Sequence, residues 1–298
     1  IVDKNFKVNC TGKIEMYGQV YHCWKKKGHG VLNLKNAMKQ SCDTYFYEIA
    51  RKLGVDRLKQ TATKFGLGDK VLKETYSNEK TGLIPDTEWK KNALGKGWVI
   101  GETLITGIGQ GYIQTTPLQL CLMTAQIANG GYKIYPRITV NKDDETFEDV
   151  KNSINENSKN FNESKTGLVE ASEQLLSYIK EKKHQPLYRN PENVKFVQNI
   201  MFASTNEVRG TSYGSRIDDP KYQFAGKTGT SQVKRISEKQ RELELKTIDI
   251  PYDERDHALY VAFGPYKNPR YALSIVVEHG GSGSKAAAPM AKKLFKLV

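Results

Sequence analysis

A lysine followed by small and hydroxyl-bearing residues stands in the C-terminal third of the chain, as Lys227, Thr228, Gly229, Thr230 and Ser231. The lysine can hold a carboxylate, the glycine lets a ligand approach the backbone, and the hydroxyl groups can donate hydrogen bonds. Lys-Thr-Gly is linked with Ser-x-x-Lys and Ser-Asp-Asn in proteins that use a serine for acyl transfer. The stretch therefore predicts that a ligand carboxylate is held beside an acyl-transfer site.

The Lys-Thr-Gly tripeptide occurs three times, beginning at Lys80, Lys165 and Lys227. Around Lys227, residues 222–233 are rich in aromatic, β-branched and hydroxyl side chains, which predicts a strand. The other two copies lie in polar segments without periodicity, and we interpret them as loops. Context therefore selects Lys227 as the functional copy.

The elements around this strand predict an antiparallel sheet covered by a helix. Residues 258–263 and 271–277 are apolar, and segment 264–269 between them contains the Gly and Pro residues of a hairpin loop. From Ala287 to the C-terminus apolar residues recur at helical spacing. A further helix, capped by Asn190, is expected before the first strand.

Three cysteines and a histidine near the N-terminus could hold a metal. Cys10, Cys23, His29 and Cys42 have the composition of a closed tetrahedral zinc site, although their spacing is wider than that of a zinc-finger knuckle. A Cys10–Cys23 disulfide and ordinary buried thiols are the alternatives. Cys121 lies in an apolar stretch and is expected to be a core thiol. The segment that holds the first of these residues, 1–30, is broken by glycines and predicts a short β-ribbon.

Helical spacing flanks the tripeptide Ser41-Cys42-Asp43. Residues 31–40 and 46–53 each carry an apolar stripe, so the tripeptide is expected to be an elbow between two helices.

The intervening segments alternate between helical stripes and polar stretches. Residues 58–65 predict a third helix with Asp56 as its N-cap, and residues 116–128 predict a buried helix that begins at a proline. Residues 69–97 are polar and predict surface loops, and residues 141–170 predict a mobile polar insertion.

The chain carries a formal net charge of +13 over 298 residues. Such a balance suggests an anionic partner, but the charges are scattered rather than blocked, which favours lysine as a generic solvated residue. No nucleic-acid recognition motif and no aromatic–arginine platform occurs, so nucleic acid is not expected as a partner. No apolar run is long enough to cross a bilayer.

Several blocks of the sequence occur in the order seen in class B penicillin-binding proteins. They are Ser41–Tyr47, Gly107–Tyr112, Thr115–Gln119, Ala128–Gly131, Lys227–Thr230 and His257–Gly281. The chain resembles most the elongation-type transpeptidase group, penicillin-binding protein 2. The resemblance implies an α/β fold of the α+β type, the penicillin-binding/β-lactamase-like transpeptidase fold, with an antiparallel sheet flanked by helices and an all-helical subdomain.

This resemblance also implies one transpeptidase domain over residues 1–298. Residues 1–140 would form a mainly helical subdomain with an N-terminal metal ribbon, residues 141–190 a polar insertion, and residues 191–298 a helix and the antiparallel sheet with its C-terminal helix.

By resemblance, the protein would be a D,D-transpeptidase that cross-links peptidoglycan stem peptides during cell-wall elongation and is a target of penicillin. Ser41 would relay a proton between a base lysine and Lys227, and Asp43 would hydrogen-bond the substrate backbone. Lys227 would place positive charge near the terminal carboxylate of D-Ala-D-Ala, and the N–H of Thr230 would form half of an oxyanion hole. The strand residues in contact with substrate would be Thr228, Gly229, Thr230 and Ser231.

The nucleophile motif Ser-x-x-Lys belongs upstream of the Ser41 elbow in this family, and no such tetrapeptide precedes Ser41. We therefore expect a fragment truncated after the nucleophile helix, inactive alone, that also lacks the membrane anchor. Two alternatives stay open. One is a β-lactamase or D,D-carboxypeptidase, in which water attacks the acyl-enzyme, and the other is a non-catalytic module that binds wall peptides or β-lactams.

The resemblance extends to a metal and to partners. It favours structural zinc at Cys10, Cys23, His29 and Cys42, with His22 as a substitute ligand, and it implies no cofactor for catalysis. The implied partners are stem peptides, β-lactams, a membrane glycan polymerase and the elongation machinery. The implied location is the bacterial inner membrane, with the catalytic domain in the periplasm.

Overall fold

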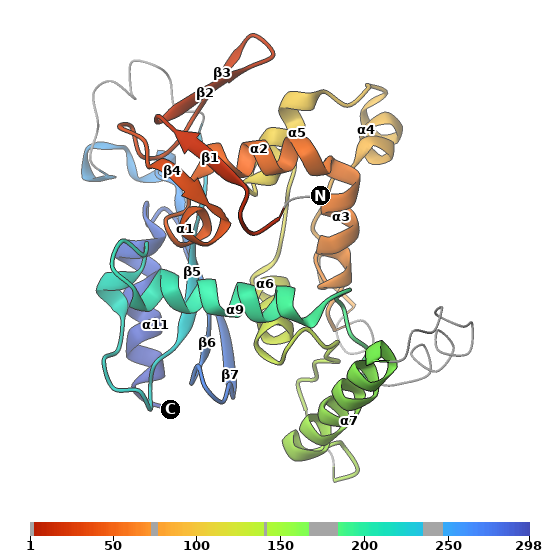
Figure 1. The fold of residues 1–298 in the computed structure, drawn as a ribbon. Helices are drawn as coiled ribbons and strands as arrows, with labels where there is room; N and C mark the ends of the chain where they lie inside the picture. Colours follow the sequence, from red (N-terminus) through yellow and green to blue (C-terminus); the bar gives the residue numbers. More distant parts are fainter. Residues whose placement is uncertain (1–2, 73–76, 140–141, 167–183, 235–246) are drawn as a thin grey trace.

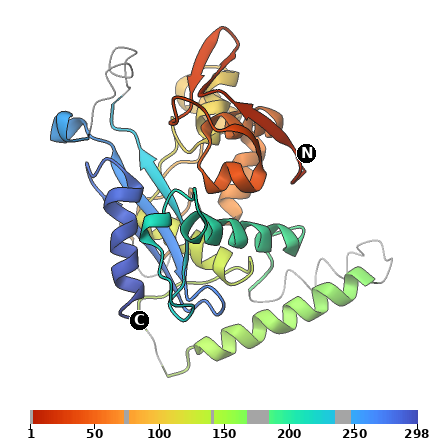
Figure 2. The same cartoon turned by 60° about the vertical axis from the view of Figure 1, so that its left-hand side comes forward.

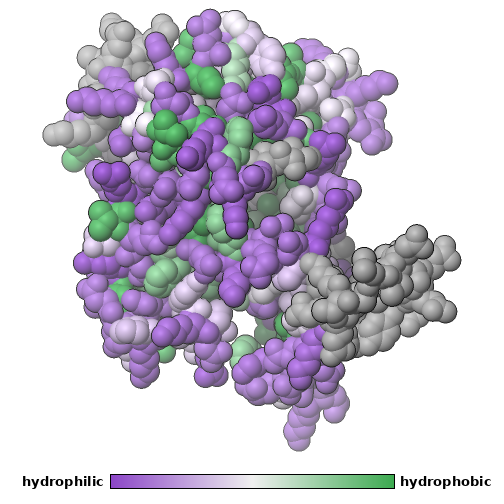
Figure 3. All heavy atoms as spheres, in the orientation of Figure 1, coloured by the Kyte–Doolittle hydropathy of each residue, from purple (hydrophilic) through white to green (hydrophobic). Residues whose placement is uncertain are grey.

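The computed structural model describes residues 3–72, 77–139, 142–166, 184–234 and 247–298. Helices from the first half of the chain lie beside a three-stranded sheet built from its last quarter (Figure 1). Hydrophilic side chains cover most of the face shown in Figure 3, and the apolar ones stand there in small separate groups. Within the described residues, none of the helices has the length and apolar character that a bilayer span needs.

Two small antiparallel ribbons open the chain, where the sequence predicts one. In the first, β1 (Lys7–Cys10) pairs with β4 (Gly30–Asn33), and in the second, β2 (Lys13–Met16) pairs with β3 (Gln19–His22). Their connection requires a glycine at position 28, where φ is +74° and a Cβ would lie 2.1 Å from the carbonyl oxygen of Cys10. This close approach brings the loop that follows Cys23 against the end of β1.

Six helices follow in the described part of the first half, namely α1 (Leu34–Lys39), α2 (Asp43–Leu53), α3 (Val55–Lys64), α4 (Thr87–Leu94), α5 (Ile100–Gly107) and α6 (Pro117–Ala128). The expected elbow between α1 and α2 is confirmed, although residues 31–33, expected in the first helix, belong to β4. The helix that begins at a proline is also confirmed, and Thr116 and Gln119 form a reciprocal cap at its start, with Thr116 Oγ1 accepting from the N–H of Gln119 at 3.2 Å. Its expected apolar burial is wrong, because the residues that are buried on it are the polar Gln119, Thr124 and Gln126.

Two expectations for this half are wrong. The N-cap of α3 is Gly54, and the carboxylate of Asp56 instead accepts hydrogen bonds at 3.0 Å from the N–H and hydroxyl of Thr87. Residues 69–97 are not all loop, because α4 lies within them and Asp86 caps it by accepting from Trp89 N–H at 2.7 Å. The polar composition of this segment gave no helical pattern, although Asp86, a typical N-cap residue, was present in the sequence.

The polar segment after residue 140 contains a helix, α7 (Phe147–Thr166), which Figure 2 shows extending away from the rest of the chain. Lys165 and Thr166 of the second Lys-Thr-Gly copy lie in this helix, so the expected loop is wrong there, whereas Lys80 lies in a loop as expected. Gly167 and the rest of that segment up to residue 183 lie outside the described residues.

The sheet has the strand order β5–β6–β7 and is antiparallel, as predicted. Its strands are β5 (Ala225–Ser231), β6 (His257–Gly264) and β7 (Tyr271–Val277), with Lys227 opposite Val261 and Thr230 opposite Ala258. Helix α11 (Ala288–Phe295) covers one face, while α6 and α9 (Pro191–Asn206) contact the other (Figures 1 and 2). The cap at Asn190 is confirmed, since its side chain accepts from the N–H of Glu192 at 3.0 Å.

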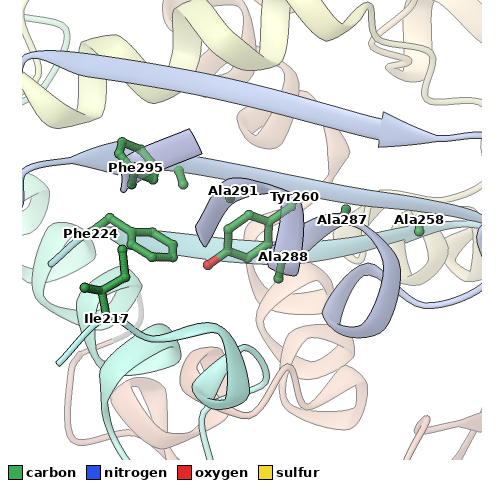
Figure 4. Packing of buried hydrophobic residues seen from close by; sticks show 9 residues of the cluster. Ile217, Phe224, Ala258, Tyr260, Ala287, Ala288, Ala291 and Phe295 are labelled. Carbon is green, nitrogen blue, oxygen red and sulfur yellow. The ribbon is translucent and has the colours of Figure 1, made fainter. Parts of the chain in front are cut away.

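Alternation along β6 explains how α11 approaches the sheet. Ala258, Tyr260 and Ala262 are fully buried and belong to one core cluster with Ala287, Ala288, Ala291 and Phe295 (Figure 4). Small side chains on both elements bring the helix close to the strand, and Phe295 stacks on Phe224 with ring centroids 4.8 Å apart. The result is a rigid support for the central strand, and through it for β5.

Candidate active site and cysteine–histidine cluster

Ser41 and Lys227, which are 186 residues apart in the sequence, meet where the helices adjoin the sheet. Lys227 Nζ donates to Ser41 Oγ at 2.6 Å and to the carbonyl of Thr228 at 3.0 Å. Burial lowers the pKa of the Lys227 ammonium to about 8, against the attraction of Asp43, which raises it. The side chain is therefore a charged donor at neutral pH that can lose its proton in mildly alkaline solution.

The backbone of Ser41 adopts a left-handed conformation, with φ of +53°. It follows the C-cap of α1, where the N–H of Ser41 donates to the carbonyl of Met38 at 3.2 Å and the N–H of Cys42 donates to that of Ala37 at 2.9 Å. This pair of bonds is the Schellman helix ending, whose left-handed position is usually glycine. A serine at this position is therefore strained, as residues at functional sites often are.

Trp24 donates hydrogen bonds to both Ser41 and Asp43, in the elbow between α1 and α2. Its backbone N–H donates to a carboxylate oxygen of Asp43 at 2.8 Å, and its indole Nε1–H donates to the carbonyl of Ser41 at 2.8 Å. Burial raises the pKa of Asp43 to about 7, with the neighbouring Cys23 thiolate adding to the effect. One residue thus positions both candidate site residues of the tripeptide, Ser41 and Asp43.

The free edge of β5 carries the predicted substrate-binding residues. Because the carbonyl of Thr230 accepts from Gln110 Nε2 at 2.6 Å, outside the sheet, the backbone groups of Thr230 face away from β6. The Thr228 hydroxyl, also on this strand, donates to Thr211 Oγ1 at 3.0 Å. Thr230 and Ser231 are exposed, and Gly229 is partly buried. Within the described residues no further strand pairs with this edge of β5, and a strand edge beside a cationic side chain can bind an extended peptide that ends in a carboxylate.

The four predicted metal ligands come together. One ligand atom each from Cys10, Cys23, His29 and Cys42 lies within 4.8 Å of the others. His29 Nδ1 is 3.6 Å from Cys10 Sγ and 3.5 Å from Cys23 Sγ. A tetrahedral site with Zn–S of ~2.3 Å and Zn–N of ~2.0 Å has sulfur–nitrogen separations of about 3.5 Å, which these match.

The chemistry of the donors fits a metal as well. All four cysteines of the chain are free thiols, which disfavours a Cys10–Cys23 disulfide. A hydrogen bond from the Cys42 thiol lowers the pKa of Cys23 to about 4, and burial lowers the pKa of His29, so a thiolate and a neutral imidazole face each other. His22 lies outside this group, and Cys121 lies apart on α6 with its pKa raised by burial.

Residues 1–296 match the family of the penicillin binding protein transpeptidase domain. The chain belongs to this family. A peptidoglycan D,D-transpeptidase MrdA of Acinetobacter baumannii is 34% identical over 297 residues, which are 99% of this chain and 39% of that protein. Another MrdA, from Salmonella typhimurium, is 32% identical over 92% of this chain and 39% of its own length. The chain thus spans about two fifths of the length of these relatives.

Solved structures of penicillin-binding protein 2 share the fold. The complex of this protein with MreC from Helicobacter pylori has a TM-score of 0.75 at 29% identity, over 99% of this chain and 46% of that one. The Pseudomonas aeruginosa protein in complex with WCK 5153 has a TM-score of 0.73 at 32% identity, over 99% of this chain and 56% of that one. The transpeptidase fold and the resemblance to penicillin-binding protein 2 are confirmed.

We assigned no role from the sequence to three residues that the structure brings to the site, although Gln110 lies in the block Gly107–Tyr112 that carries the family resemblance. Trp24 stands between Cys23 and a lysine run, Thr211 follows α9, and Gln110 lies in a glycine-flanked loop after α5. Only Gln110 carried a signal, since a polar side chain between Gly109 and Gly111 is typical of a loop with a function. The other two are recognised only by what they contact.

Proposed function

We propose that the protein containing this chain is a peptidoglycan D,D-transpeptidase of cell-wall elongation. The observation that supports it best is the contact of 2.6 Å between Lys227 Nζ and Ser41 Oγ beside the free edge of β5. Membership of the transpeptidase family over residues 1–296 agrees with it. The proteins named MrdA are transpeptidases, so a β-lactamase or D,D-carboxypeptidase is the less favoured function.

The proposed reaction is acyl transfer in two steps. A serine oxygen attacks the carbonyl of the penultimate D-Ala, the C–N bond to the last D-Ala breaks, and that residue leaves as an amine; an amine of a second stem peptide then displaces the serine. In this scheme Lys227 holds the leaving carboxylate, and Ser41 passes a proton between Lys227 and the base lysine of a Ser-x-x-Lys motif. The N–H of Thr230 stabilises the oxyanion, and Asp43 orients the substrate backbone.

Substituting Lys227 in the full-length protein tests this proposal. Lys227→Ala is expected to lower the second-order rate constant of acylation by a penicillin about a hundredfold or more, because contacts to developing charge contribute a few kcal/mol to the transition state. Lys80→Ala and Lys165→Ala, in the other two Lys-Thr-Gly copies, are the matched controls and should leave it unchanged. An unaltered rate in Lys227→Ala would refute the role of this lysine.

A non-catalytic module that binds wall peptides or β-lactams is the second candidate. The two functions are separated by the gene sequence that precedes Ile1. A serine and a lysine at Ser-x-x-Lys spacing there support the enzyme, whereas an intact reading frame without them supports the binding module.

We infer that the protein acts with the elongation machinery of the cell envelope. A relative of this fold is solved as a complex with MreC, which supports a partner of that kind. The proposed location is the inner membrane, with residues 1–298 in the periplasm and a membrane glycan polymerase as a further partner. Pull-down of the full-length protein with its native envelope partners tests this assignment.

We also propose that Cys10, Cys23, His29 and Cys42 hold a structural zinc ion. Bound there, zinc would link the ribbons to the elbow, because Cys42 lies between the two functional residues Ser41 and Asp43. No step of catalysis requires the metal to leave or to bind substrate.

Metal analysis of protein purified without chelator tests the zinc proposal. About one equivalent is expected, and Cys23→Ser should lower it, whereas Cys121→Ser, at a half-buried thiol on α6 outside the cluster, should not. Less than about a tenth of an equivalent in the wild type, together with a Cys10–Cys23 disulfide in the peptide map, would refute the proposal.

A further inference from the structure

The side chain of Gln110 lies across the free edge of β5. Its Nε2 donates to the carbonyl of Thr230 at 2.6 Å, and its Oε1 accepts from the N–H of Gln232 at 3.4 Å. Gln232 is the first residue after β5, and residues two apart on an extended chain direct their backbone groups to the same edge. The amide therefore spans Thr230 and the next position along that edge. Strand β6 occupies the opposite edge.

An extended peptide that adds to this edge needs the same backbone groups. In antiparallel pairing, a residue can exchange both hydrogen bonds with the residue directly opposite. Under the proposed function the N–H of Thr230 holds the scissile carbonyl, so the carbonyl of Thr230 would accept the N–H of that same substrate residue. Gln110 Nε2 already uses this acceptor.

The backbone of Gln110 is anchored, so the movable part is its side chain. The N–H of Gln110 donates to the carbonyl of Ile105 at 3.1 Å, and the N–H of Gly109 donates to that of Thr106 at 2.9 Å. These bonds form a Schellman ending of α5, with Gly109 at φ of +79° in the left-handed position. Rotation about the side-chain bonds of Gln110 releases Thr230 without moving the loop.

We propose that the amide of Gln110 mimics substrate, occupying the β5 edge in the free protein and yielding the carbonyl of Thr230 to the incoming peptide. The ligand class is an extended peptide, or a β-lactam, whose reacting residue carries an amide N–H. This inference rests on the proposed function. The competing role for Gln110 is structural, with its hydrogen bonds linking the loop after α5 to β5 and holding the strand in place. Removing the side chain lowers the rate constant of acylation if the role is structural, and raises it if Gln110 competes with substrate.

Acylation of the full-length protein by two penams separates these roles. Benzylpenicillin carries an acylamino N–H next to its reacting carbonyl, and penicillanic acid has the same ring system without that group. Gln110→Ala should raise the second-order rate constant for benzylpenicillin about two- to tenfold, the usual range for one net hydrogen bond, and leave that for penicillanic acid unchanged. Gln110→Met, which keeps the side-chain length but has no N–H donor and adds no charge, should act in the same direction.

The control is Gln114→Ala, four residues along the same loop, whose side chain is exposed and which should change neither rate constant. A fall with both penams, equal effects on both, or no effect in either Gln110 variant would overturn the inference while leaving the proposed function in place. If Gln110→Ala does not fold, the Met variant decides. A wild-type protein that neither penam acylates would overturn the proposed function itself, and this inference with it.

Discussion

Replacing Ser41 by glycine and by alanine should separate the strain of its backbone from the role of its hydroxyl. Both variants lose the hydrogen bond with Lys227, whose Nζ lies 2.6 Å from Ser41 Oγ. Only glycine relieves the left-handed conformation at φ of +53°. A residue other than glycine in the left-handed conformation lowers the stability of the folded state by about 1–2 kcal/mol, which Ser41→Gly recovers. The greater conformational freedom of glycine in the unfolded chain cancels about 0.4–1 kcal/mol of this gain.

The expected difference is therefore about 1 kcal/mol in favour of Ser41→Gly over Ser41→Ala. For a chain of this size that corresponds to roughly 2 °C in the midpoint of thermal unfolding. Both variants should be equally impaired in acylation, because neither retains the hydroxyl that is proposed to transfer a proton.

Ser153 provides the matched control, since it lies in the interior of helix α7. There the order should reverse, with the glycine variant less stable than the alanine variant by about 0.5–1 kcal/mol. Differential scanning calorimetry of all four variants measures both differences. If Ser41→Ala proves as stable as Ser41→Gly, the inference that the backbone of Ser41 is strained is wrong.

Two further predictions concern charged side chains. Binding of a carboxylate-bearing ligand should weaken as the pH rises through about 8, because the buried Lys227 ammonium loses its proton there. The affinity of Lys227→Arg, titrated over the same pH range, should not fall, since its guanidinium stays charged. Lys90→Met should lower the free energy of unfolding by about 2–4 kcal/mol, measured by denaturant unfolding. The Lys90 side chain is only 5% exposed, and its ammonium lies 2.5 Å from a carboxylate oxygen of Glu102. Removing the ammonium leaves that carboxylate without its cation. A loss below about 0.5 kcal/mol would contradict the second prediction, and Lys90→Met combined with Glu102→Gln should recover part of the stability.

Local patterns in the sequence determined most of the elements that carry the site. Helical spacing on both sides of the Ser41 tripeptide was sufficient to predict an elbow, because an apolar stripe at a period of 3.6 residues can be buried only by a helix. Runs of aromatic, β-branched and apolar residues, with hairpin residues between two of them, were sufficient to predict the sheet that contains Lys227. Composition identified the three cysteines and the histidine as one group of candidate metal ligands. Where polar residues dominated, as in α4 and α7, the same patterns were too weak to predict helices.

Tertiary structure decided what these elements do together. The contact between Ser41 and Lys227 joins residues 186 apart, and it depends on how the helices pack against β5, which no local period encodes. The left-handed backbone of Ser41, the clamp by Trp24 and the bridge from Gln110 to the strand edge also arise from packing and capping across the fold. Sequence determines which side chains are available and which elements carry them; their distances are set by long-range packing, because hydrogen bonds of this kind require ångström-scale placement.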